Sequence, residues 1–314
     1  MATAISIQGL TKKYVDVWAK QEVIAVNNLN LEVQEGEIFG FLGRNGAGKT
    51  TTIKMLLGLI FPTAGDATIL GKPMGDNVVK SMISYLPEET YFYDSMSAWD
   101  LLDFYGRLFR IPGAERQRRI KLSLEKVRLQ PDAWKRNIRG YSKGMRQRTG
   151  IAQALINDPK VLFLDEPTSG LDPIAHAELR DIVASLKDEG KTVFLSSHQL
   201  ADVELICSRV AIIHRGKLLR TGQITDLVAG ERTEIVVKGP GLSNGTLQSL
   251  RAITPYVEPQ EDNQTVTLFS EDDNQTSAVI DLVRNAKGSV ISVVPHKRTL
   301  EQVFVETVRK EEGL

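Results

Sequence analysis

The sequence predicts an α/β protein built on a largely parallel sheet, followed by a smaller α+β unit. Three observations support this fold class. A short apolar strand, GEIFGFL, runs into a glycine-rich turn and then into the helical pattern of TTIKMLLGLI. Two further apolar strands, VLFLDEP and TVFLSSH, are separated by helical sequence, the alternation typical of a parallel sheet. After about Thr221 the sequence changes to short strands with polar connections.

The composition limits the classes of partner. The chain has 314 residues, 42% of them hydrophobic, which is enough for one large domain and a smaller one. Lysine plus arginine equals aspartate plus glutamate, at 39 each, so no bulk charge attracts nucleic acid or an anionic membrane. No apolar run approaches the roughly 20 residues that span a bilayer, and the N-terminus lacks a signal-peptide pattern. We therefore expect a chain that does not cross a membrane by itself.

The elements follow in order along the chain. Near the N-terminus, ISIQGLTKKY and VIAVNNLNLEV alternate apolar and polar residues, which predicts strands. In TTIKMLLGLI, the residues Ile53, Leu56, Leu57 and Ile60 share one helical face. Helix-forming sequence then dominates from Ser97 to about Leu129. The single cysteine, Cys207, cannot form an internal disulfide, and we expect it to be buried in a protein of a reducing compartment.

The C-terminal part predicts a βαββαβ unit of the ferredoxin-like type. Its strands are TEIVVKG, a weak ITPYVEP, TVTLF and SVISVV, with the helical segment SAVIDLVRNAKG before the last of them. A final helix in RTLEQVFVETVRK carries apolar residues at helical spacing, which pack on their own sheet or help hold two copies together. We place the main domain at residues 1–225 and a small accessory or regulatory domain at 231–314.

A phosphate-binding loop is the first functional motif. GRNGAGKT fits G-x-x-x-x-G-K-[ST], in which backbone N–H groups and a helix N-terminus surround phosphate oxygens. Lys49 would reach the β and γ phosphates, and the Thr50 hydroxyl would bind Mg²⁺. The predicted nucleotide-binding residues of this loop are Gly43, Arg44, Asn45, Gly46, Ala47, Gly48, Lys49, Thr50 and Thr51.

Polar residues at two strand ends complete a predicted hydrolytic site. Asp165 and Glu166 end the strand VLFLDE, where ligands bind in open α/β sheets. Asp165 is the expected Mg²⁺ partner and Glu166 the residue that polarises the attacking water. His198 ends the strand VFLSSH and would contact the γ-phosphate. Alternatively, Asp165 and Glu166 only cap the turn that follows the strand, and His198 is a structural residue that forms hydrogen bonds. The other histidines lack such a context and are interpreted as surface or packing residues: His176, His214 and His296.

A second turn, YSKGMRQR at residues 141–148, also has the form of a phosphate site. Ser142 and Gly144 stand at the start of a predicted helix, where a hydroxyl and a close-approach glycine suit a phosphate. The alternative is a simple serine N-cap. Lys143 would either add phosphate affinity or lie in solvent.

Taken in order, Tyr14, GRNGAGKT, YLPEE, YSKGM, VLFLDEP, SGLD and SSH resemble the nucleotide-binding subunit of an ATP-binding cassette (ABC) transporter, over about residues 4–222. The resemblance implies a P-loop ATPase core with a mixed, mostly parallel sheet, an antiparallel β subdomain and a helical subdomain at about residues 90–157. It implies ATP and Mg²⁺ as cofactors, and hydrolysis of ATP to ADP and phosphate coupled to transport.

The resemblance also implies a homodimer. Two cassettes would face each other head to tail, so that ATP lies between the P-loop of one copy and Ser142 and Gly144 of the other. Asp172, in SGLD, would communicate between the two sites.

Two further assignments follow from the resemblance. Tyr14 would stack on adenine, with Trp18 as the alternative. Glu88 stands where the family usually has glutamine, and we expect it to bind Mg²⁺ as a hard oxygen ligand.

YLPEE, YSKGM and RTLEQVFVETV are similar to export-type subunits that pair with type 2 membrane proteins. The resemblance implies a transmembrane permease as partner, docked on the helical subdomain that begins with TYFYDSMSAWDLLDFYGRLF, and a cytoplasmic, peripheral position on the inner face of the cell membrane. The aromatic residues of this segment either pack in the core or line the docking groove. No nucleic-acid partner is expected. The alternative is a soluble, non-transport cassette ATPase that acts on nucleic acid or ribosomes. A small-molecule kinase or GTPase would leave YSKGM and SGLD unexplained.

Overall fold

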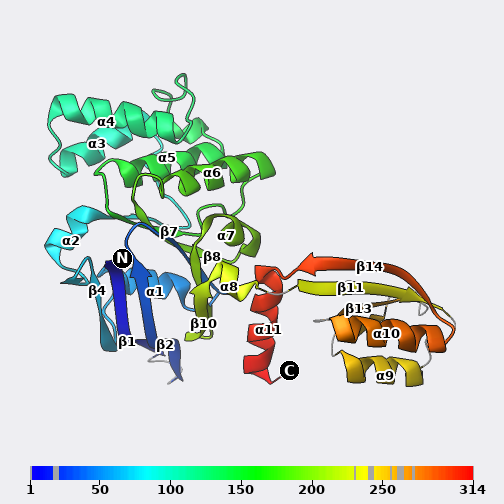
Figure 1. Cartoon of the computed structure of the whole chain (residues 1–314). Coiled ribbons are helices and arrows are strands. Elements are labelled where there is room, and N and C mark those ends of the chain that lie inside the picture. Colours follow the sequence, from blue (N-terminus) through cyan, green and yellow to red (C-terminus); the bar gives the residue numbers. More distant parts are fainter. Residues whose placement is uncertain are drawn as a thin grey trace. The chain divides into compact units, whose positions relative to one another are not determined.

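The computed structural model describes residues 2–16, 21–229, 231–239, 244–254, 257–259, 265–270 and 273–313. The chain divides into two compact units (Figure 1). The larger unit consists of Met1–Ile224 together with Glu306–Leu314, and the smaller one of Thr225–Val305.

The larger unit is organised around a six-stranded mixed sheet. In sheet order its strands are β10 (Lys217–Gln223), β9 (Arg209–His214), β3 (Ile38–Leu42), β8 (Thr192–Ser197), β7 (Val161–Asp165) and β6 (Ile83–Leu86). All neighbours pair in parallel except β9 and β10, which are antiparallel. Every residue of β3, β7 and β8 is buried, which explains their unbroken apolar sequences. The predicted largely parallel sheet is confirmed.

The strand order brings the predicted motifs to one edge of the sheet. Because β3, β8 and β7 are parallel neighbours, the residues that follow them, Gly43, His198 and Glu166, start from the same edge. The register places Asp165 opposite Ser196. The sequence predicted strand ends at these positions but did not predict that β8 lies between β3 and β7.

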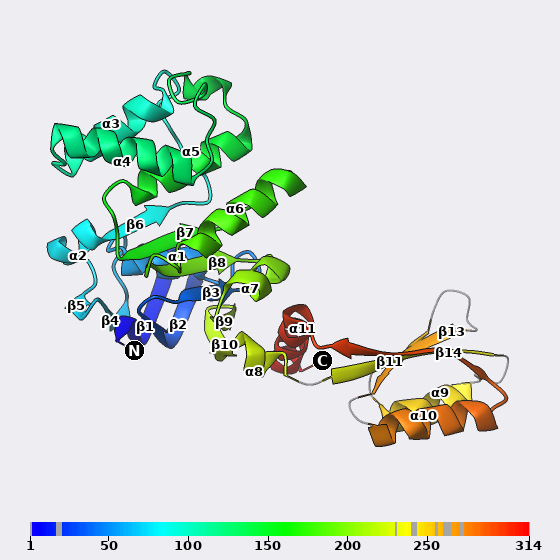
Figure 2. The ribbon, with the colours of Figure 1, turned by 45° about the horizontal axis from the view of Figure 1, so that its top comes forward.

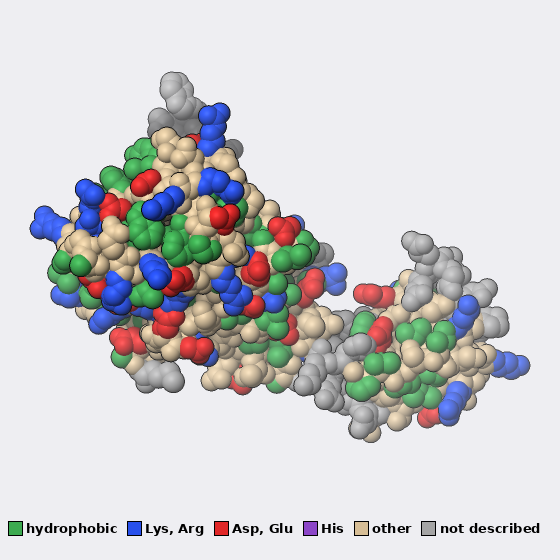
Figure 3. All heavy atoms as spheres, turned by 90° about the horizontal axis from the view of Figure 1, so that it is seen from above, with side chains coloured by type: hydrophobic (Ala, Val, Ile, Leu, Met, Phe, Trp, Pro, Cys, Tyr) green, Lys and Arg blue, Asp and Glu red, His purple; other side chains and the backbone are tan. Residues whose placement is uncertain are grey.

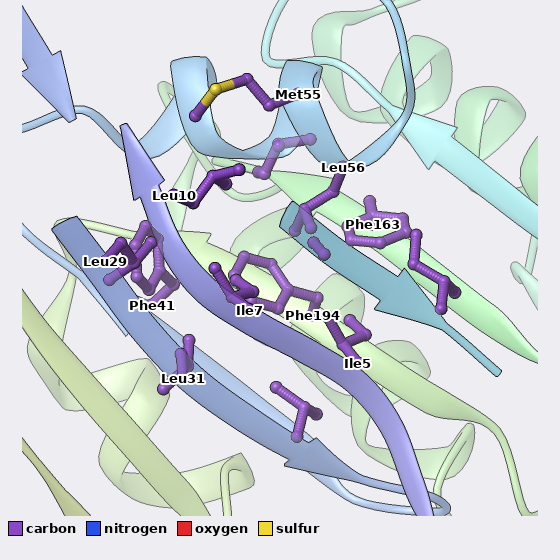
Figure 4. Packing of buried hydrophobic residues seen from close by; sticks show 14 of the residues in the cluster. Ile5, Ile7, Leu10, Leu29, Leu31, Phe41, Met55, Leu56, Phe163 and Phe194 are labelled. Atoms are coloured by element: carbon purple, nitrogen blue, oxygen red, sulfur yellow. The ribbon is translucent and has the colours of Figure 1, made fainter. Parts of the chain in front are cut away.

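A second, antiparallel sheet packs on the same core. Its strands, in sheet order, are β2 (Gln21–Gln34), β1 (Thr3–Asp16), β4 (Ala64–Ile69) and β5 (Lys72–Pro73). Buried side chains of this sheet face those of the mixed sheet and of α1 (Lys49–Leu56) (Figure 4). The ring centroid of Phe194 lies 5.9, 5.2 and 5.6 Å from those of Phe39, Phe41 and Phe163. Each such buried ring contributes about 2 kcal/mol by area alone, so this cluster anchors the strands that carry the motifs.

The helix after the P-loop is shorter than the sequence predicted. It ends at Leu56, while the apolar pattern continues to Ile60. Gly58, with φ of 69°, ends the helical path because a glycine adopts this left-handed conformation at little cost. Ile53, Leu56 and Leu57 are buried as expected, and Ile60 is partly buried against the same core.

Three helices form the region between β6 and β7: α3 (Ala98–Leu108), α4 (Gly113–Lys126) and α5 (Lys143–Leu155). Ser97 starts α3 through a capping box, in which its Oγ accepts a hydrogen bond of 3.1 Å from the Asp100 N–H. A left-handed residue, Arg110, and Pro112 separate α3 from α4. The helical region that the sequence predicted around residues 97–129 is therefore two helices with a turn between them.

Shorter and later elements complete the larger unit. They are α2 (Asn77–Met82), the 3-10 turn η1 (Ile138–Gly140), α6 (Pro173–Ser185) and α7 (Leu200–Ile206). The division between the two units falls within the next helix, α8 (Ile224–Leu227), after its first residue. In the part of the chain that the structure describes, no helix is both long enough and apolar enough to cross a bilayer.

The smaller unit has the predicted βαββαβ order. Its elements along the chain are β11 (Glu231–Lys238), α9 (Asn244–Ile253), β12 (Val257–Pro259), β13 (Thr265–Ser270), α10 (Asp273–Asn285) and β14 (Ser289–Lys297). The sheet order β12-β13-β11-β14 is fully antiparallel, and apolar residues from both helices and the strands form its core. The ferredoxin-like topology is confirmed.

The final helix, α11 (Leu300–Glu312), begins in the smaller unit and ends in the larger one. Its residues Leu300, Val303 and Val308 are buried within the single chain. Phe304 is partly buried, and Val305 on the same helix is 39% exposed, so the structure leaves both interpretations of this helix open.

Candidate active site

The P-loop connects β3 to α1, and its glycines stand where side chains do not fit. A Cβ on Gly48, which has φ of 106°, would come within 2.3 Å of the Ala25 carbonyl oxygen. A Cβ on Gly43 would come within 2.7 Å of the Ile213 carbonyl oxygen. The loop is thus pressed against β2 and β9, which leaves its other side open to a ligand.

That open side is a cavity of about 210 Å³. Its lining combines backbone N–H groups at a helix N-terminus with one lysine and two carboxylates, a donor set suited to phosphate and a metal ion. The lining residues are Ala25, Arg44, Asn45, Gly46, Ala47, Gly48, Lys49, Thr50, Thr51, Glu88 and Glu166.

Lys49 points into this cavity with a nearly buried side chain. Its Nζ donates a hydrogen bond of 2.7 Å to the Gly43 carbonyl oxygen and lies 3.0 Å from Glu166 Oε1. Both charged side chains are 6% exposed. This contact is an ion pair that does not have hydrogen-bond geometry. Oε1 is buried, and it accepts no hydrogen bond from the residues that the structure describes. Oε1 is thus a buried acceptor without a hydrogen-bond donor among the described residues, on a residue that lines the cavity.

The other oxygen of Glu166 is held by His198. The ring Nδ1 lies 2.7 Å from Glu166 Oε2, and the His198 backbone N–H is 3.3 Å from the same atom. Since a carboxylate only accepts hydrogen bonds, the proton in the ring contact lies on Nδ1. Glu166 also has a φ of 49°, which is uncommon for a residue with a side chain.

Thr50 and Asp165 meet beside this pair. The Thr50 hydroxyl donates a hydrogen bond of 2.8 Å to Asp165 Oδ2, and Ser196 Oγ donates to Oδ1. A hydroxyl, a carboxylate and phosphate oxygens form the hard-oxygen set that Mg²⁺ prefers. Glu88 lines the same cavity. The residues therefore fit the metal that the sequence predicted, although no three His, Cys, Asp or Glu side chains among the described residues form a metal cluster of their own.

Tyr85, on β6, is a partner of Asp165 that the sequence analysis missed. Burial first, then the Asp165 charge and a hydrogen bond to it, raise the pKa of the Tyr85 hydroxyl well above its ordinary range. The hydroxyl therefore stays protonated and donates to Asp165. Tyr85 stands in the YLPEE motif, three residues before Glu88, but only the pairing of β6 with β7 brings it to Asp165.

Ser142 and Gly144 lie away from the P-loop cavity. Ser142 is the N-cap of α5, and its Oγ accepts a hydrogen bond of 3.3 Å from the Met145 N–H. Gly144 is buried against α6, where an added Cβ would lie 3.1 Å from the Ala175 Cβ. Both residues line a separate cavity of about 240 Å³ that also contains Arg128, Arg148 and Glu178. One chain does not bring its two predicted phosphate turns together.

Lys143 extends over the loop before α6. A Cβ on Gly170 would come within 2.2 Å of Lys143 Nζ, so the lysine lies against that loop. Asp172 caps α6, since its Oδ1 accepts hydrogen bonds of 3.1 and 3.0 Å from the Ile174 and Ala175 N–H groups.

Tyr14 lies on β1, and its side chain does not line the P-loop cavity. The residue is 44% exposed, and Lys12 Nζ lies 5.2 Å from its ring centroid. Trp18, the alternative adenine contact, lies outside the described residues. Cys207 was predicted to be buried, and it is only partly buried in the structure. Burial of its thiol raises the pKa of that group well above its ordinary range, so the thiol stays protonated.

Comparison with known proteins identifies the family. Residues 26–169 match a family described as ABC transporter. An uncharacterized ABC transporter ATP-binding protein of Synechocystis is 44% identical over 295 residues, which are 93% of this chain and 81% of that protein. The chain belongs to the ABC transporter ATP-binding family. It is therefore an ATPase of the cassette type, and ATP is the nucleotide of the P-loop.

Two further comparisons extend this result. The Nod factor export ATP-binding protein I of Cupriavidus pinatubonensis is 34% identical over 263 residues, covering 83% of this chain and 78% of that protein. A dimeric ATP-binding cassette in a post-hydrolysis state, bound to ADP and Pi, has a TM-score of 0.64 at 23% identity, covering 70% of this chain and 98% of that one. The predicted P-loop ATPase fold is confirmed by this likeness and by the two sheets of the larger unit.

Proposed function

We propose that this ABC ATPase energises export through a separate transmembrane subunit. The observation that supports its chemistry best is the buried oxygen Oε1 of Glu166, a residue that lines the P-loop cavity. This oxygen lies 3.0 Å from Lys49 Nζ and accepts no hydrogen bond from the described residues. A carboxylate oxygen in this position accepts a proton from a water that attacks the γ-phosphate. Lys49 binds the β and γ phosphates, and His198 orients Glu166 and contacts the γ-phosphate.

The metal ligands of this proposal are Thr50, Asp165 and Glu88. When bound, Mg²⁺ neutralises charge on the β and γ phosphate oxygens. Thr50 and Asp165 are already joined by their 2.8 Å hydrogen bond, and Tyr85 and Ser196 hold the carboxylate. Glu88 lines the cavity at the position where the family usually has glutamine. Tyr85 and Ser196 are outer partners of the ligand Asp165, and partners of this kind orient a metal ligand before the ion binds.

We propose that the site is completed by a second copy. Ser142 and Gly144 line a cavity separate from the P-loop, so their contact with the γ-phosphate is made in trans. The dimeric state of the cassette with the same fold supports this arrangement. Ala175 lines the same cavity as Ser142, and Asp172 lies about one helical turn before it. We propose that Asp172 couples the two nucleotide sites of the dimer. Tyr14 contacts adenine, as the resemblance implies.

The membrane partner docks on the helical subdomain at about residues 90–157. Apolar and basic side chains are interspersed on the face that Figure 3 shows. Among the apolar ones of this subdomain, the most exposed are Tyr91 at 86% and Tyr93 at 65%, followed by Leu108 at 61%. Exposed aromatic residues of this kind are typical of protein interfaces. We propose a type 2 permease as the partner, so that the protein is peripheral on the cytoplasmic face of the cell membrane.

The same proposal divides the chain into an ATP-binding domain at residues 1–225 and an accessory domain at 231–314. Export as the direction is supported by the relative from Cupriavidus pinatubonensis, which is named for Nod factor export. Equal numbers of basic and acidic residues, 39 of each, offer no basis for a nucleic-acid partner.

Co-purification tests the proposal. Tagged Glu166→Gln is expressed in the native host, membranes are solubilised with ATP and Mg²⁺, and the captured proteins are identified by mass spectrometry. Exposed Glu35→Gln is the matched control for the charge change. We expect one polytopic membrane protein in near-equal amount with Glu166→Gln and less of it with the control. Capture of ribosomes or nucleic acid, with no membrane protein, would contradict the transport function.

A further inference from the structure

His176 makes contacts that its sequence context did not predict. It lies on α6, and its Nε2 is 2.8 Å from Asp202 Oδ2 on the adjacent α7. The same nitrogen makes a hydrogen bond with Gln199 Oε1. Because a carboxylate only accepts, Nε2 carries the proton and is the donor toward Asp202. The helices α6 and α7 are in contact, and both are labelled close to β8 in Figure 2.

The acceptor, Asp202, is a nearly buried carboxylate. Its side chain is 8% exposed, so it requires nearby donors. Thr168 Oγ1 lies 3.4 Å from Asp202 Oδ2, and Arg180 Nη1 lies 3.7 Å from Asp202 Oδ1. These contacts are long, which leaves His176 as the closest donor to this carboxylate. Loss of His176 would leave the buried charge poorly compensated.

The cluster joins the two loops that hold the proposed catalytic pair. Thr168 follows Glu166 by two residues, and Gln199 directly follows His198. Thr168 Oγ1 also lies 3.5 Å from Gln199 Oε1, while Glu166 Oε2 and His198 Nδ1 are 2.7 Å apart. The same two loops are therefore joined by a short contact between Glu166 and His198 and by a longer one between Thr168 and Gln199.

We propose that His176 and Asp202 are positioning residues that hold His198 against Glu166. They touch neither the P-loop cavity nor Lys49, so they act through Gln199 and Thr168. The first turn of α6 adds a further link, because the His176 N–H donates a hydrogen bond of 2.9 Å to the Asp172 carbonyl oxygen. This inference rests on the proposed roles of Glu166 and His198.

Steady-state hydrolysis by the full-length protein provides the first test. Because His176 acts on the orientation of His198, His176→Leu and Asp202→Asn lower kcat by about tenfold and change KM by less than about twofold. His176→Gln retains a side-chain N–H donor and recovers most of the rate. Asp181→Asn, the same charge change on the exposed side of α6, leaves kcat unchanged. Wild-type kcat in both His176→Leu and Asp202→Asn would overturn the proposal.

A double variant tests whether the effect passes through His198. If it does, His176→Leu slows wild type but does not slow His198→Ala further. An additional slowing equal to that seen in wild type would place the action of His176 elsewhere and overturn the inference.

Nuclear magnetic resonance separates this inference from the proposed function. The hydrogen-bonded Nδ1–H of His198 gives a ring-proton signal that disappears in His198→Ala. We expect that signal to be lost or shifted in His176→Leu and retained in His176→Gln and Asp181→Asn. An unchanged signal in His176→Leu overturns the positioning role. If His198→Ala hydrolyses ATP at the wild-type rate, the proposed role of His198 fails, and the signal still tests the position of its ring.

Discussion

Lys49 Nζ lies 3.0 Å from Glu166 Oε1, and both side chains are 6% exposed. In this arrangement, the lysine expected on the phosphates and the carboxylate expected on the attacking water neutralise each other. Binding of a nucleotide phosphate would compete for the lysine and release Oε1 for a water. Under the proposed function, the pair would therefore link nucleotide binding to hydrolysis.

Removal of the lysine alone should destabilise the fold. Lys49→Met leaves the Glu166 carboxylate in a nearly buried position without its cation, and we expect the free energy of unfolding to fall by roughly 1–3 kcal/mol. The double variant Lys49→Met/Glu166→Gln should lose less than Lys49→Met. Urea denaturation measures both. Lys54→Met, an exposed position on the same helix, is the control. Equal losses in the single and double variants would show that the two side chains are not coupled.

Tyr85 should contribute to metal binding through Asp165. Tyr85→Phe removes only the hydroxyl, and we expect the Mg²⁺ concentration for half-maximal hydrolysis to rise by about tenfold, because an outer partner of the ligand is lost. Tyr105→Phe, a partly buried tyrosine on α3, is the matched control. Identical Mg²⁺ dependence in Tyr85→Phe and wild type would exclude this role.

The same tyrosine predicts a pH effect on stability. Burial and the Asp165 charge raise the pKa of Tyr85 in the folded protein, whereas an unfolded tyrosine titrates at about 10. Below that pH both states keep the proton. Above it, the unfolded state loses the proton while the folded state keeps it, so the free energy of unfolding falls as pH rises. Urea denaturation at pH 9 and at about pH 10.5 should show a smaller loss for Tyr85→Phe than for wild type.

Comparison of two serine N-caps tests whether Ser142 binds nucleotide in addition to capping a helix. Ser142 caps α5 and Ser97 caps α3, and in each case the serine Oγ accepts a backbone hydrogen bond. Replacing either with alanine should lower the free energy of unfolding by about 1 kcal/mol. In a Glu166→Gln background, only Ser142→Ala should weaken ATP-dependent dimerisation. Analytical ultracentrifugation with and without ATP measures this. Equal dimerisation of both variants would identify Ser142 as a helix cap and no more.

Glu88 and Glu89 form a matched pair for the metal proposal. Glu88 lines the P-loop cavity, whereas Glu89 accepts a hydrogen bond from Tyr91. Glu88→Gln should raise the Mg²⁺ concentration needed for half-maximal hydrolysis severalfold, because a hard anionic ligand becomes neutral. Glu89→Gln should leave it unchanged. A hydrolysis rate and Mg²⁺ dependence in Glu88→Gln equal to wild type would count against metal binding by Glu88.

Some predictions from the sequence depended only on local chemistry. The strands of the mixed sheet are buried on both faces, so β3, β7 and β8 were recognisable as unbroken apolar runs. The P-loop was equally recognisable, because Gly43 and Gly48 stand where backbone atoms of other strands exclude a Cβ. By contrast, β6 was missed, since a strand of four residues with two partly buried positions carries little periodic signal.

Other features depend on residues that are distant in the sequence. Glu166 and His198 are 32 residues apart, and they meet because β7 and β8 are parallel neighbours. Tyr85 reaches Asp165 only through the pairing of β6 with β7. His176 was interpreted as a surface or packing residue, because its partner Asp202 lies on another helix and nothing in the spacing indicates their contact.

The fold class, the P-loop and the polar residues at the strand ends could be predicted from the sequence, because each follows from local spacing and from the requirement to bury apolar strands. Which of these side chains meet depends on the packing of the folded chain. The order of β3, β8 and β7 joins Lys49, Glu166 and His198 into one site, and the packing of α5 places Ser142 in another cavity. The physical reason is that a hydrogen bond or an ion pair requires two groups within about 3 Å, and chain topology sets that distance for residues far apart in the sequence.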